Sequence, residues 1–403
     1  MKITEIQTFY LSDPQGELRL DHFLWVQIVT DEGLVGLGET SSLPRAVAAV
    51  VHDLYGPILL GADPRDVAYL WAEMHAAAQF AGAGGSELRA LSAIDVALWD
   101  IVAQAAGLPL YRLLGGQCHD RIRVYNTCLN AGVHRDLDNS IEQPGRLAEE
   151  LLAVGFTAMK VWPFDKFAPR SRFRTPDQHR GTYWAFGPIG QSLAQRDIES
   201  GLEVLDSIRG AVGNRMDIAI EGHGRWNLPT AIRIANALAP YDVLFLEDAI
   251  PVTSTSDMAA LTHQSPVPTC FSERLFTRWA FRDALEHGAM RVVMFDVCWG
   301  GGVTEGRNVA NMADTYHLPF ATHGATGPVL TMASLHVCMA APNAMVMEVV
   351  RSHMNTWYSS VVTEVVVVED GHIGPPAAVP GLGTKLREDF VSRADVVSQR
   401  TSM

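Results

Sequence analysis

Six acidic or histidine residues recur at nearly even intervals in the second half of the chain, and each ends or follows a short apolar run. The intervals are 23–27 residues, roughly the length of a β-strand, an α-helix and the two loops that join them. Polar residues that follow successive parallel strands meet at one end of a closed barrel, where the chemistry of such barrels takes place. The spacing therefore predicts a parallel α/β barrel with a polar site. The residues are Glu221, Glu247, Glu273, Asp296, His323 and Glu348.

The strand and helix patterns divide the chain into three parts. Residues 1–120 predict an α+β capping domain, with strands before residue 41, a hairpin turn at 31–33 and helices from 45 to 114. Residues 121–350 hold eight short apolar runs separated by amphipathic segments, the pattern of a modified TIM-type (β/α) barrel. Residues 351–403 include a segment rich in Pro and Gly, and we expect this part to return to the capping domain.

The composition is that of a globular protein, with 48% hydrophobic and 19% charged residues among 403. A formal net charge of −14 disfavours nucleic acid and anionic lipid as partners. The five scattered cysteines lack CxxC spacing and fit reduced thiols better than a disulfide framework or a zinc site. The first residues indicate a strand rather than a signal peptide, and no segment approaches a membrane span. We therefore expect a cytoplasmic protein.

One interval is much longer than the others. The number of residues between Lys160 and Glu221 is more than twice the number between the other strand ends. The extra length lies in residues 163–190, which have no periodicity and several Arg, His, Pro and aromatic residues. A long loop in a compact domain is usually functional. An active-site lid and a subunit contact are both open interpretations of this insertion.

The three glutamates of the even series predict a metal site. Carboxylates that converge at one barrel end repel one another unless a cation neutralises them. Oxygen ligands favour a hard cation such as Mg²⁺, which takes few protein ligands. The other interpretation of Glu221, Glu247 and Glu273 is three unrelated acids that accept hydrogen bonds from loop amides.

The remaining site candidates supply proton chemistry and substrate contacts. Asp296 and His323 end adjacent strands, and an Asp–His hydrogen bond would orient the ring as a general base. His223 follows Glu221 by two residues and is either a second acid/base or a loop residue. Arg225 either binds substrate or caps a helix. Lys160 ends the second strand and either binds a carboxylate or acts as a base with a lowered pKa.

Several short motifs along the whole chain together resemble one family. They are AMKVW, IEGHGRW, FLEDAIP, SERL, FDVCWGGGVTEG, THGATGPV and VPGLGTKL. They resemble the enolase superfamily, mandelate racemase subgroup. The resemblance implies Mg²⁺ bound by Glu221, Glu247 and Glu273, a general-base pair Asp296–His323, and Glu348 near the substrate carboxylate or the enolate oxygen. It also implies removal of a proton α to that carboxylate, with the metal stabilising the developing charge.

Two departures from the subgroup pattern narrow the expected activity. The third-strand ligand is usually Asp, but here it is Glu221. The second strand carries Lys160 followed two residues later by Trp162, where the subgroup's second basic lysine would stand. Racemisation needs proton transfer on both faces of the substrate, so the missing lysine disfavours a racemase. Separately, we expect Trp162, Arg225 and Lys160 to contact substrate.

The His-Gly-Arg context of His223 is similar to that of sugar-acid dehydratases of the galactonate type. The resemblance implies that His323 takes the C2 proton of an aldonate and that His223 protonates the leaving 3-hydroxyl, giving a 2-keto-3-deoxy acid. An epimerase or cycloisomerase of the same superfamily and a catalytically silent sugar-acid-binding homologue are the alternatives. The sugar, its stereochemistry and the number of its carboxylates stay open, and we expect a homo-oligomer.

Overall fold

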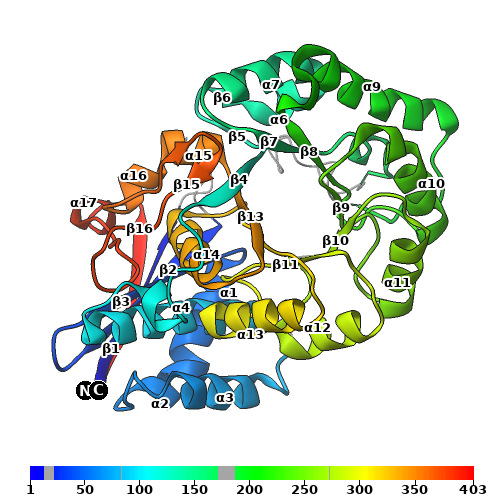
Figure 1. Ribbon diagram of the computed structural model, residues 1–403. Helices are drawn as coiled ribbons and strands as arrows, with labels where there is room; N and C mark the ends of the chain where they lie inside the picture. The colour runs from blue at the N-terminus through cyan, green and yellow to red at the C-terminus, as the bar shows by residue number, and fades with distance from the viewer. Residues whose placement is uncertain (13–21, 83, 171–186, 272) are drawn as a thin grey trace.

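Eight parallel strands close into a barrel in the computed structural model, which describes residues 1–12, 22–82, 84–170, 187–271 and 273–403. The strands follow one another in chain order around the barrel, and the last pairs with the first. The predicted barrel with its capping domain is confirmed (Figure 1). The strands are β4 (Ile122–Thr127), β7 (Ala158–Val161), β8 (Asp217–Glu221), β9 (Phe245–Glu247), β10 (Thr269–Phe271), β11 (Val292–Phe295), β12 (Phe320–Thr322) and β13 (Ala344–Val349).

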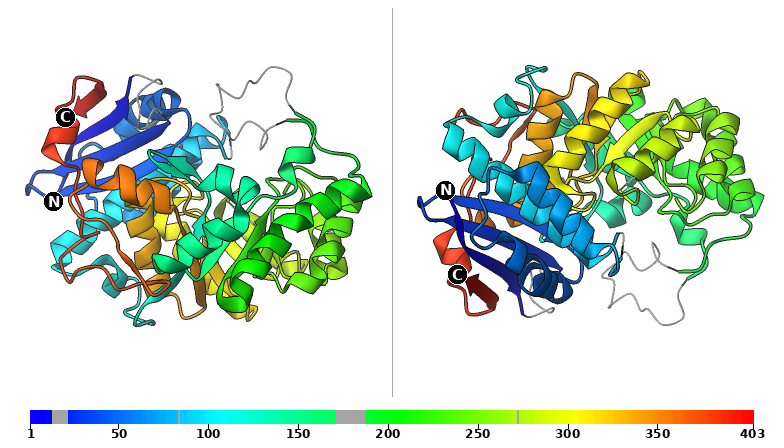
Figure 2. Two further views of the ribbon diagram at one scale, coloured as in Figure 1. Left: turned by 90° about the horizontal axis from the view of Figure 1, so that it is seen from above. Right: turned by 90° about the horizontal axis from the view of Figure 1, so that it is seen from below.

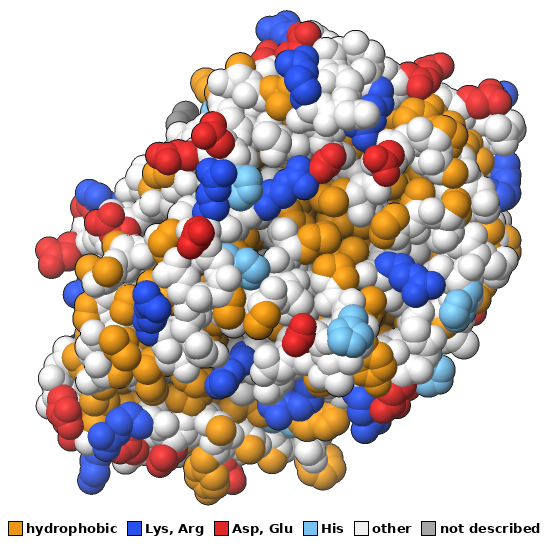
Figure 3. Space-filling view, in the orientation of Figure 1, with side chains coloured by type: hydrophobic (Ala, Val, Ile, Leu, Met, Phe, Trp, Pro, Cys, Tyr) orange, Lys and Arg blue, Asp and Glu red, His pale blue; other side chains and the backbone are white. Residues whose placement is uncertain are grey.

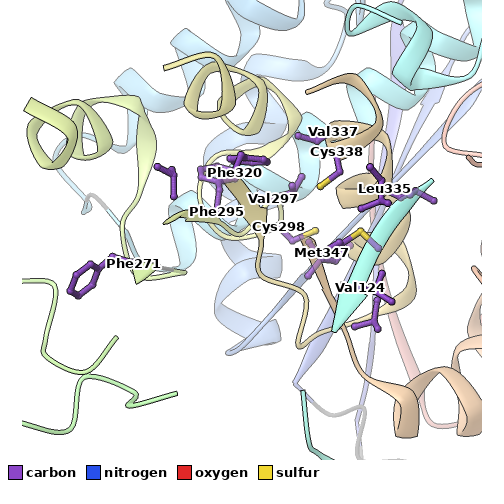
Figure 4. Close-up of a cluster of buried hydrophobic side chains, with 14 of the residues drawn as sticks. Val124, Phe271, Phe295, Val297, Cys298, Phe320, Leu335, Val337, Cys338 and Met347 are labelled. Atoms are coloured by element: carbon purple, nitrogen blue, oxygen red, sulfur yellow. The ribbon is translucent and has the colours of Figure 1, made fainter. Parts of the chain in front are cut away.

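Amphipathic helices surround the barrel because each returns the chain to the start of the next parallel strand. They are α7 (Pro144–Ala153), α9 (Gln195–Val212), α10 (Leu228–Leu238), α11 (Thr255–Gln264), α12 (Thr277–Glu286), α13 (Gly302–Thr315) and α14 (Pro328–Ala340). Short elements α6 (Asp136–Glu142), β5 (Asn130–Ala131) and β6 (His134–Arg135) follow the first barrel strand. Apolar side chains fill the layer between strands and helices, and Figure 4 shows part of it, with Phe295 and Phe320 from strands and Val337 and Cys338 from α14.

The capping domain joins an antiparallel sheet to a group of helices. Its strands are β1 (Ile3–Leu11), β2 (Phe23–Thr30) and β3 (Val35–Ser41), and its helices are α1 (Pro44–Ala49), α2 (Gly56–Leu59), α3 (Val67–Ala78), α4 (Ser86–Ala106) and α5 (Leu110–Leu113). Helix α4 packs directly on β3 because two strand positions are glycine. A Cβ atom at Gly38 would lie 1.8 Å from the carbonyl oxygen of Ala93, so only glycine permits this approach.

The C-terminal part returns to the capping domain. Strand β16 (Val396–Ser402) pairs antiparallel with β1, so both chain ends lie at the same sheet (Figures 1 and 2). Before it come α15 (Arg351–Thr356), α16 (Tyr358–Val361), β14 (Val368–Glu369), β15 (His372–Ile373) and α17 (Glu388–Val391). The hairpin β14–β15 adds to the barrel strand β4. The residue limits proposed for the three parts remain predictions.

Buried carboxylates of the capping domain bind the ends of barrel helices. Glu39 accepts hydrogen bonds from Trp25 Nε1 (2.8 Å) and from the backbone N–H groups of Val329 and Leu330 at the start of α14. Asp95 accepts bonds from the backbone N–H and the hydroxyl of Thr304 in the first turn of α13. Burial raises the pKa of both carboxyls to about 7. These contacts fix the capping domain over the barrel.

The surface and the cysteines match the composition. Acidic and basic side chains are interspersed over the face shown in Figure 3. Four cysteines are buried, Cys118 is exposed, and all five are free thiols.

Within the described ranges, no helix is both long and apolar enough to cross a membrane. The centre of the insertion, residues 171–186, lies outside the described residues, so its predicted role as a lid or subunit contact stays a prediction, as does the homo-oligomer.

Candidate active site

The even series of polar residues lies at the carboxyl ends of the barrel strands, as the spacing predicts. Glu221 and Glu247 are the last residues of β8 and β9 and are directly paired in register. Glu273 follows β10, Asp296 follows β11 and His323 follows β12. All of these side chains are buried, and so is Glu348 in β13. Parallel strands of similar length place their ends at one rim, which is why the series becomes one site.

Lys160 of β7 lies at the centre of the acids. Its Nζ atom is 2.7 Å from Glu247 Oε2, 2.8 Å from Glu348 Oε1 and 3.1 Å from Glu221 Oε2. Burial alone would lower the pKa of Lys160, but these carboxylates hold it well above its usual value. In this arrangement the neighbouring negative charge favours the ammonium form of Lys160, and the choice between a carboxylate-binding role and a base role for Lys160 stays a prediction.

The acids have the chemistry of a cation site, but Lys160 occupies the space between them. Among the described residues, no three His, Cys, Asp or Glu side chains are placed to hold a metal ion together. Glu273 instead pairs with Arg274, at 3.3 Å. However, Glu247 Oε1 and Glu273 Oε2 are buried and have no hydrogen-bond partner within the described part of the chain. Buried carboxylate oxygens without donors fit a hard divalent cation, so the donor set suits Mg²⁺.

Asp296 and His323 form the predicted pair. Asp296 Oδ2 is 2.6 Å from His323 Nδ1, and the backbone N–H of Cys298 donates to the other carboxylate oxygen. His323 Nε2 lies 3.6 Å from Glu348 Oε2. Burial would lower the pKa of His323, but Glu348 and Asp296 raise it to about 9. The pair fixes the ring with Nδ1 toward the Asp296 carboxylate and Nε2 toward Glu348, and the predicted general-base role of His323 stays a prediction.

His223 has a carboxylate partner that sequence reasoning missed. Its Nδ1 atom contacts the buried Asp165, in the described part of the insertion, and its ring meets the Trp162 ring edge-on at 4.5 Å between centroids. Burial would lower the pKa of His223, but Glu221 and Asp165 raise it. Asp165 lies in an aperiodic segment, so no spacing rule pointed to it. The structure thus contains a second His–Asp pair.

The two pairs come from opposite sides of the barrel. Strands β8 and β12 are the third and seventh of eight when counted from β4, and strands four apart in a closed barrel of eight face each other. His223 leaves β8 with a positive φ of 46°, an uncommon conformation for a residue other than glycine. The two histidines therefore approach the acid cluster from opposite sides of the same rim.

Trp162 and Arg225, which we predict to contact substrate, lie in different surroundings: Trp162 packs beside His223, and Arg225 binds the backbone of the insertion. Trp162 is buried beside His223, at the mouth. Arg225 donates to the carbonyl oxygen of Pro169 at 2.6 Å and thereby holds the described edge of the insertion. The assignment of Trp162, Arg225 and Lys160 to substrate binding stays a prediction.

Comparisons with known proteins agree with this fold and site. A family model for "Enolase C-terminal domain-like" matches residues 144–390, and one for "Mandelate racemase / muconate lactonizing enzyme, N-terminal domain" matches residues 16–115. D-galactonate dehydratase from Xanthomonas axonopodis pv. citri (strain 306) is 30% identical over 405 residues, which cover 98% of this chain and 94% of the relative.

Two solved structures extend the likeness over the whole chain. An enolase of the mandelate racemase subgroup from Agrobacterium tumefaciens, solved with a succinimide residue, sodium and phosphate, is 39% identical with a TM-score of 0.85. An enolase protein from Sargasso Sea environmental sequencing is 36% identical with a TM-score of 0.86. Each comparison covers 100% of this chain and 99% of the other.

The capped barrel with acids and paired histidines at its strand ends defines a class of barrel enzymes that carry acid–base chemistry at the mouth. Within that class, the chain belongs to the enolase superfamily, in the group of mandelate racemase and muconate lactonizing enzymes. The resemblance drawn from the sequence motifs is therefore confirmed.

Proposed function

We propose that this chain is a Mg²⁺-dependent dehydratase that removes the C2 proton and the 3-hydroxyl of a sugar acid and releases a 2-keto-3-deoxy acid. The coarser part of this statement, an acid-sugar dehydratase among the carbon–oxygen lyases, is confirmed by D-galactonate dehydratases aligned over 97–98% of the chain. The cofactor, the residue roles and the substrate belong to the proposal.

The observation that carries the proposal is the presence of two His–Asp pairs on opposite sides of the acid cluster. Loss of water needs a base at C2 and an acid at the departing oxygen. With one histidine on each side, one can act as the base at C2 and the other as the acid at the departing oxygen, so no single group has to move between the two atoms.

The chain's residues divide the reaction as follows. His323 Nε2 takes the C2 proton, and the Asp296 carboxylate holds the ring and stabilises the imidazolium that forms. The electron pair left at C2 becomes the C2–C3 double bond as the C3–O bond breaks. His223, protonated beside Asp165, gives its proton to the departing oxygen, which leaves as water. The enol then ketonises. Lys160 and Glu348, which contact each other at 2.8 Å, would orient the substrate carboxylate.

Glu221, Glu247 and Glu273 would hold Mg²⁺, which supplies positive charge against the negative charge that develops on the substrate carboxylate. Glu273, one of these three residues, is among the carboxylates that raise the pKa of His323 to about 9, so a bound cation would offset part of that charge. We therefore expect His323 to act as the general base when Mg²⁺ is bound at the site.

The test compares His323→Asn and His223→Asn in deuterated water with a set of sugar acids and Mg²⁺. The surface substitution His263→Asn on α11 is the matched control. We expect both site variants to lose dehydration by at least about 100-fold. His323→Asn should also lose exchange of the C2 proton, whereas His223→Asn should retain it. Exchange that persists in His323→Asn would remove that residue from the base role.

An epimerase of the same superfamily is the second candidate, because the His223–Asp165 pair could serve as a base on the opposite face. The two functions differ in the fate of unconverted substrate. An epimerase places solvent deuterium at C2 with inverted configuration and forms no 2-keto product. A silent homologue would show neither, and titration with Mg²⁺ would detect no binding.

A further inference from the structure

An arginine of the capping domain stands beside the catalytic base. Arg89 lies in α4, and its Cζ atom is 4.0 Å from the centre of the Trp299 ring. The Trp299 ring lies 5.2 Å from the His323 ring. Arg89 Nη1 donates to the Ser41 carbonyl oxygen at 3.0 Å, and Trp299 Nε1 donates to the Ser41 hydroxyl at 3.1 Å. Arg89, Trp299 and His323 thus form a column that leads from the capping domain to the base.

One face of α4 fixes this column. Arg89, Ser92 and Asp95 are three residues apart and therefore lie along one side of the helix. The Ser92 hydroxyl accepts a bond from the Gly301 backbone N–H (2.9 Å), and Asp95 binds Thr304. Trp299 belongs to this same loop after β11, so the guanidinium and the indole are held together by neighbouring contacts. The position of Arg89 is built into the domain interface.

Arg89 makes no ion pair with an acid among the described residues, although burial lowers the pKa of its guanidinium and the more distant Asp296 and Glu273 raise it. Among the described residues, its contacts are a carbonyl oxygen and an indole ring, and neither is an ion pair. Other arginines near the barrel, such as Arg274 and Arg278, pair with carboxylates. A partly buried guanidinium favours an anion in the position its remaining N–H groups reach. Asp296 and Glu273 act on Arg89 only from beyond ion-pair distance, so the arrangement suits an anion that arrives with a ligand.

The place of Arg89 indicates which end of a substrate it meets. Under the proposed function, the reacting carboxylate lies at Lys160 and Glu348, and C2 lies at His323. The rest of the substrate must extend toward the capping domain, which covers the barrel mouth. Trp299 and then Arg89 lie on that path.

We propose that Arg89 binds a second carboxylate at the far end of the substrate, and that the preferred substrates are sugar diacids. This inference rests on the proposed function and names its substrate class. A planar guanidinium makes two parallel bonds to a carboxylate, which a terminal hydroxyl cannot match. The Trp299 ring supports one guanidinium face, and the Ser41 carbonyl fixes its plane.

The experiment compares pairs of sugar acids that share configuration and chain length but have one or two carboxylates. Wild type, Arg89→Met, Arg89→Lys and the control Arg112→Met are assayed for 2-keto product with Mg²⁺. Arg112 packs on the Tyr111 ring away from the site, so its loss should change neither substrate. We expect the wild type to prefer the diacids and Arg89→Met to lose about 10- to 100-fold in kcat/KM on them, mainly through KM. Arg89→Lys should lose less, and the monoacids should be unaffected by either change.

Two results would overturn the inference. One is a wild type that prefers monoacids, and the other is an equal loss on both classes in Arg89→Met, which would indicate a structural role. Calorimetric titration of the same acids separates this inference from the proposed function. Diacids that bind in an Arg89-dependent way without loss of water would refute the dehydratase and support the diacid site, whereas acids that bind equally well to Arg89→Met would refute the diacid site.

Discussion

Replacing Lys160 with methionine removes the ammonium group that three buried glutamates share. Methionine keeps a similar length and removes only the charge and the donors. Glu247 and Glu348 are fully buried, and Glu221 is nearly so. Without Lys160 they lose contacts of 2.7, 2.8 and 3.1 Å. The carboxylates then repel one another in a region where water cannot screen them.

The expected cost follows from buried ion pairs in general. Removing one partner of such a pair lowers the free energy of unfolding by about 3–5 kcal/mol. An unfolding entropy of about 2.1 cal/mol/K per residue, taken over 403 residues, gives about 0.85 kcal/mol/K for the chain. The melting temperature of Lys160→Met without divalent cation should therefore fall by roughly 4–6 °C.

The assay is thermal unfolding with EDTA and with increasing Mg²⁺. Mg²⁺ at about 100 times its Kd should stabilise the wild type by about 2.7 kcal/mol, and the variant should gain more, because the cation replaces a charge that is missing. The control is Lys166→Met, a half-buried lysine that packs on the Phe167 ring. A Lys160→Met protein that melts with the wild type in EDTA, or that gains no more from Mg²⁺, would refute the view that Lys160 is the internal counter-ion of these acids.

Three other substitutions test separate parts of the structure. Asp165→Asn should lower kcat for dehydration by at least about 10-fold and leave exchange of the C2 proton intact, since the His223 imidazolium loses its charged partner; equal losses in both assays would contradict this. Gly38→Ala should lower the free energy of unfolding by about 3 kcal/mol, measured in urea, because the new Cβ meets the Ala93 carbonyl. His336 is buried and its pKa is lowered by burial to about 4, so the unfolded chain binds more protons below pH 6.5 and stability is lost as the pH falls from 6.5 to 4. The stability difference between wild type and His336→Gln should therefore shrink by about 3 kcal/mol between pH 7 and pH 4, and a flat difference would show that His336 does not titrate in this range.

The sequence predicts the barrel well because one physical rule repeats over six strand ends. From Glu221 to Glu348 each strand end is separated from the next by a nearly constant length, and the polar residue after each apolar run marks the rim. The close pairing of Asp296 with His323 follows from the same rule, since adjacent parallel strands bring their following residues together. The hairpin at 31–33 was predictable from local turn chemistry and is confirmed.

The rest of the site depends on contacts that no local pattern encodes. Asp165 lies within an aperiodic insertion, and its contact with His223 joins positions 58 residues apart. Lys160 at a strand end gives no sign that its partners come from three other strands. Arg89 is one polar residue in a helix whose pattern indicates packing, and its role depends on how that helix meets the loop that carries Trp299. Such long-range contacts arise only after the domains pack.

The acid–base residues lie in the barrel, whereas Arg89 lies in the capping domain. The reaction and the choice of substrate can therefore change independently. The barrel supplies the acids, the paired histidines and Lys160 from strand ends whose positions are set by eight hydrogen-bonded neighbours. The capping domain supplies Arg89, and Ser92 and Asp95 on the same helix face fix its place relative to the loop that carries Trp299. A change at Arg89 therefore alters what meets the distal end of a substrate without moving His323. A change at Asp95 would instead shift guanidinium and indole together, so it should alter the orientation of substrate at the base.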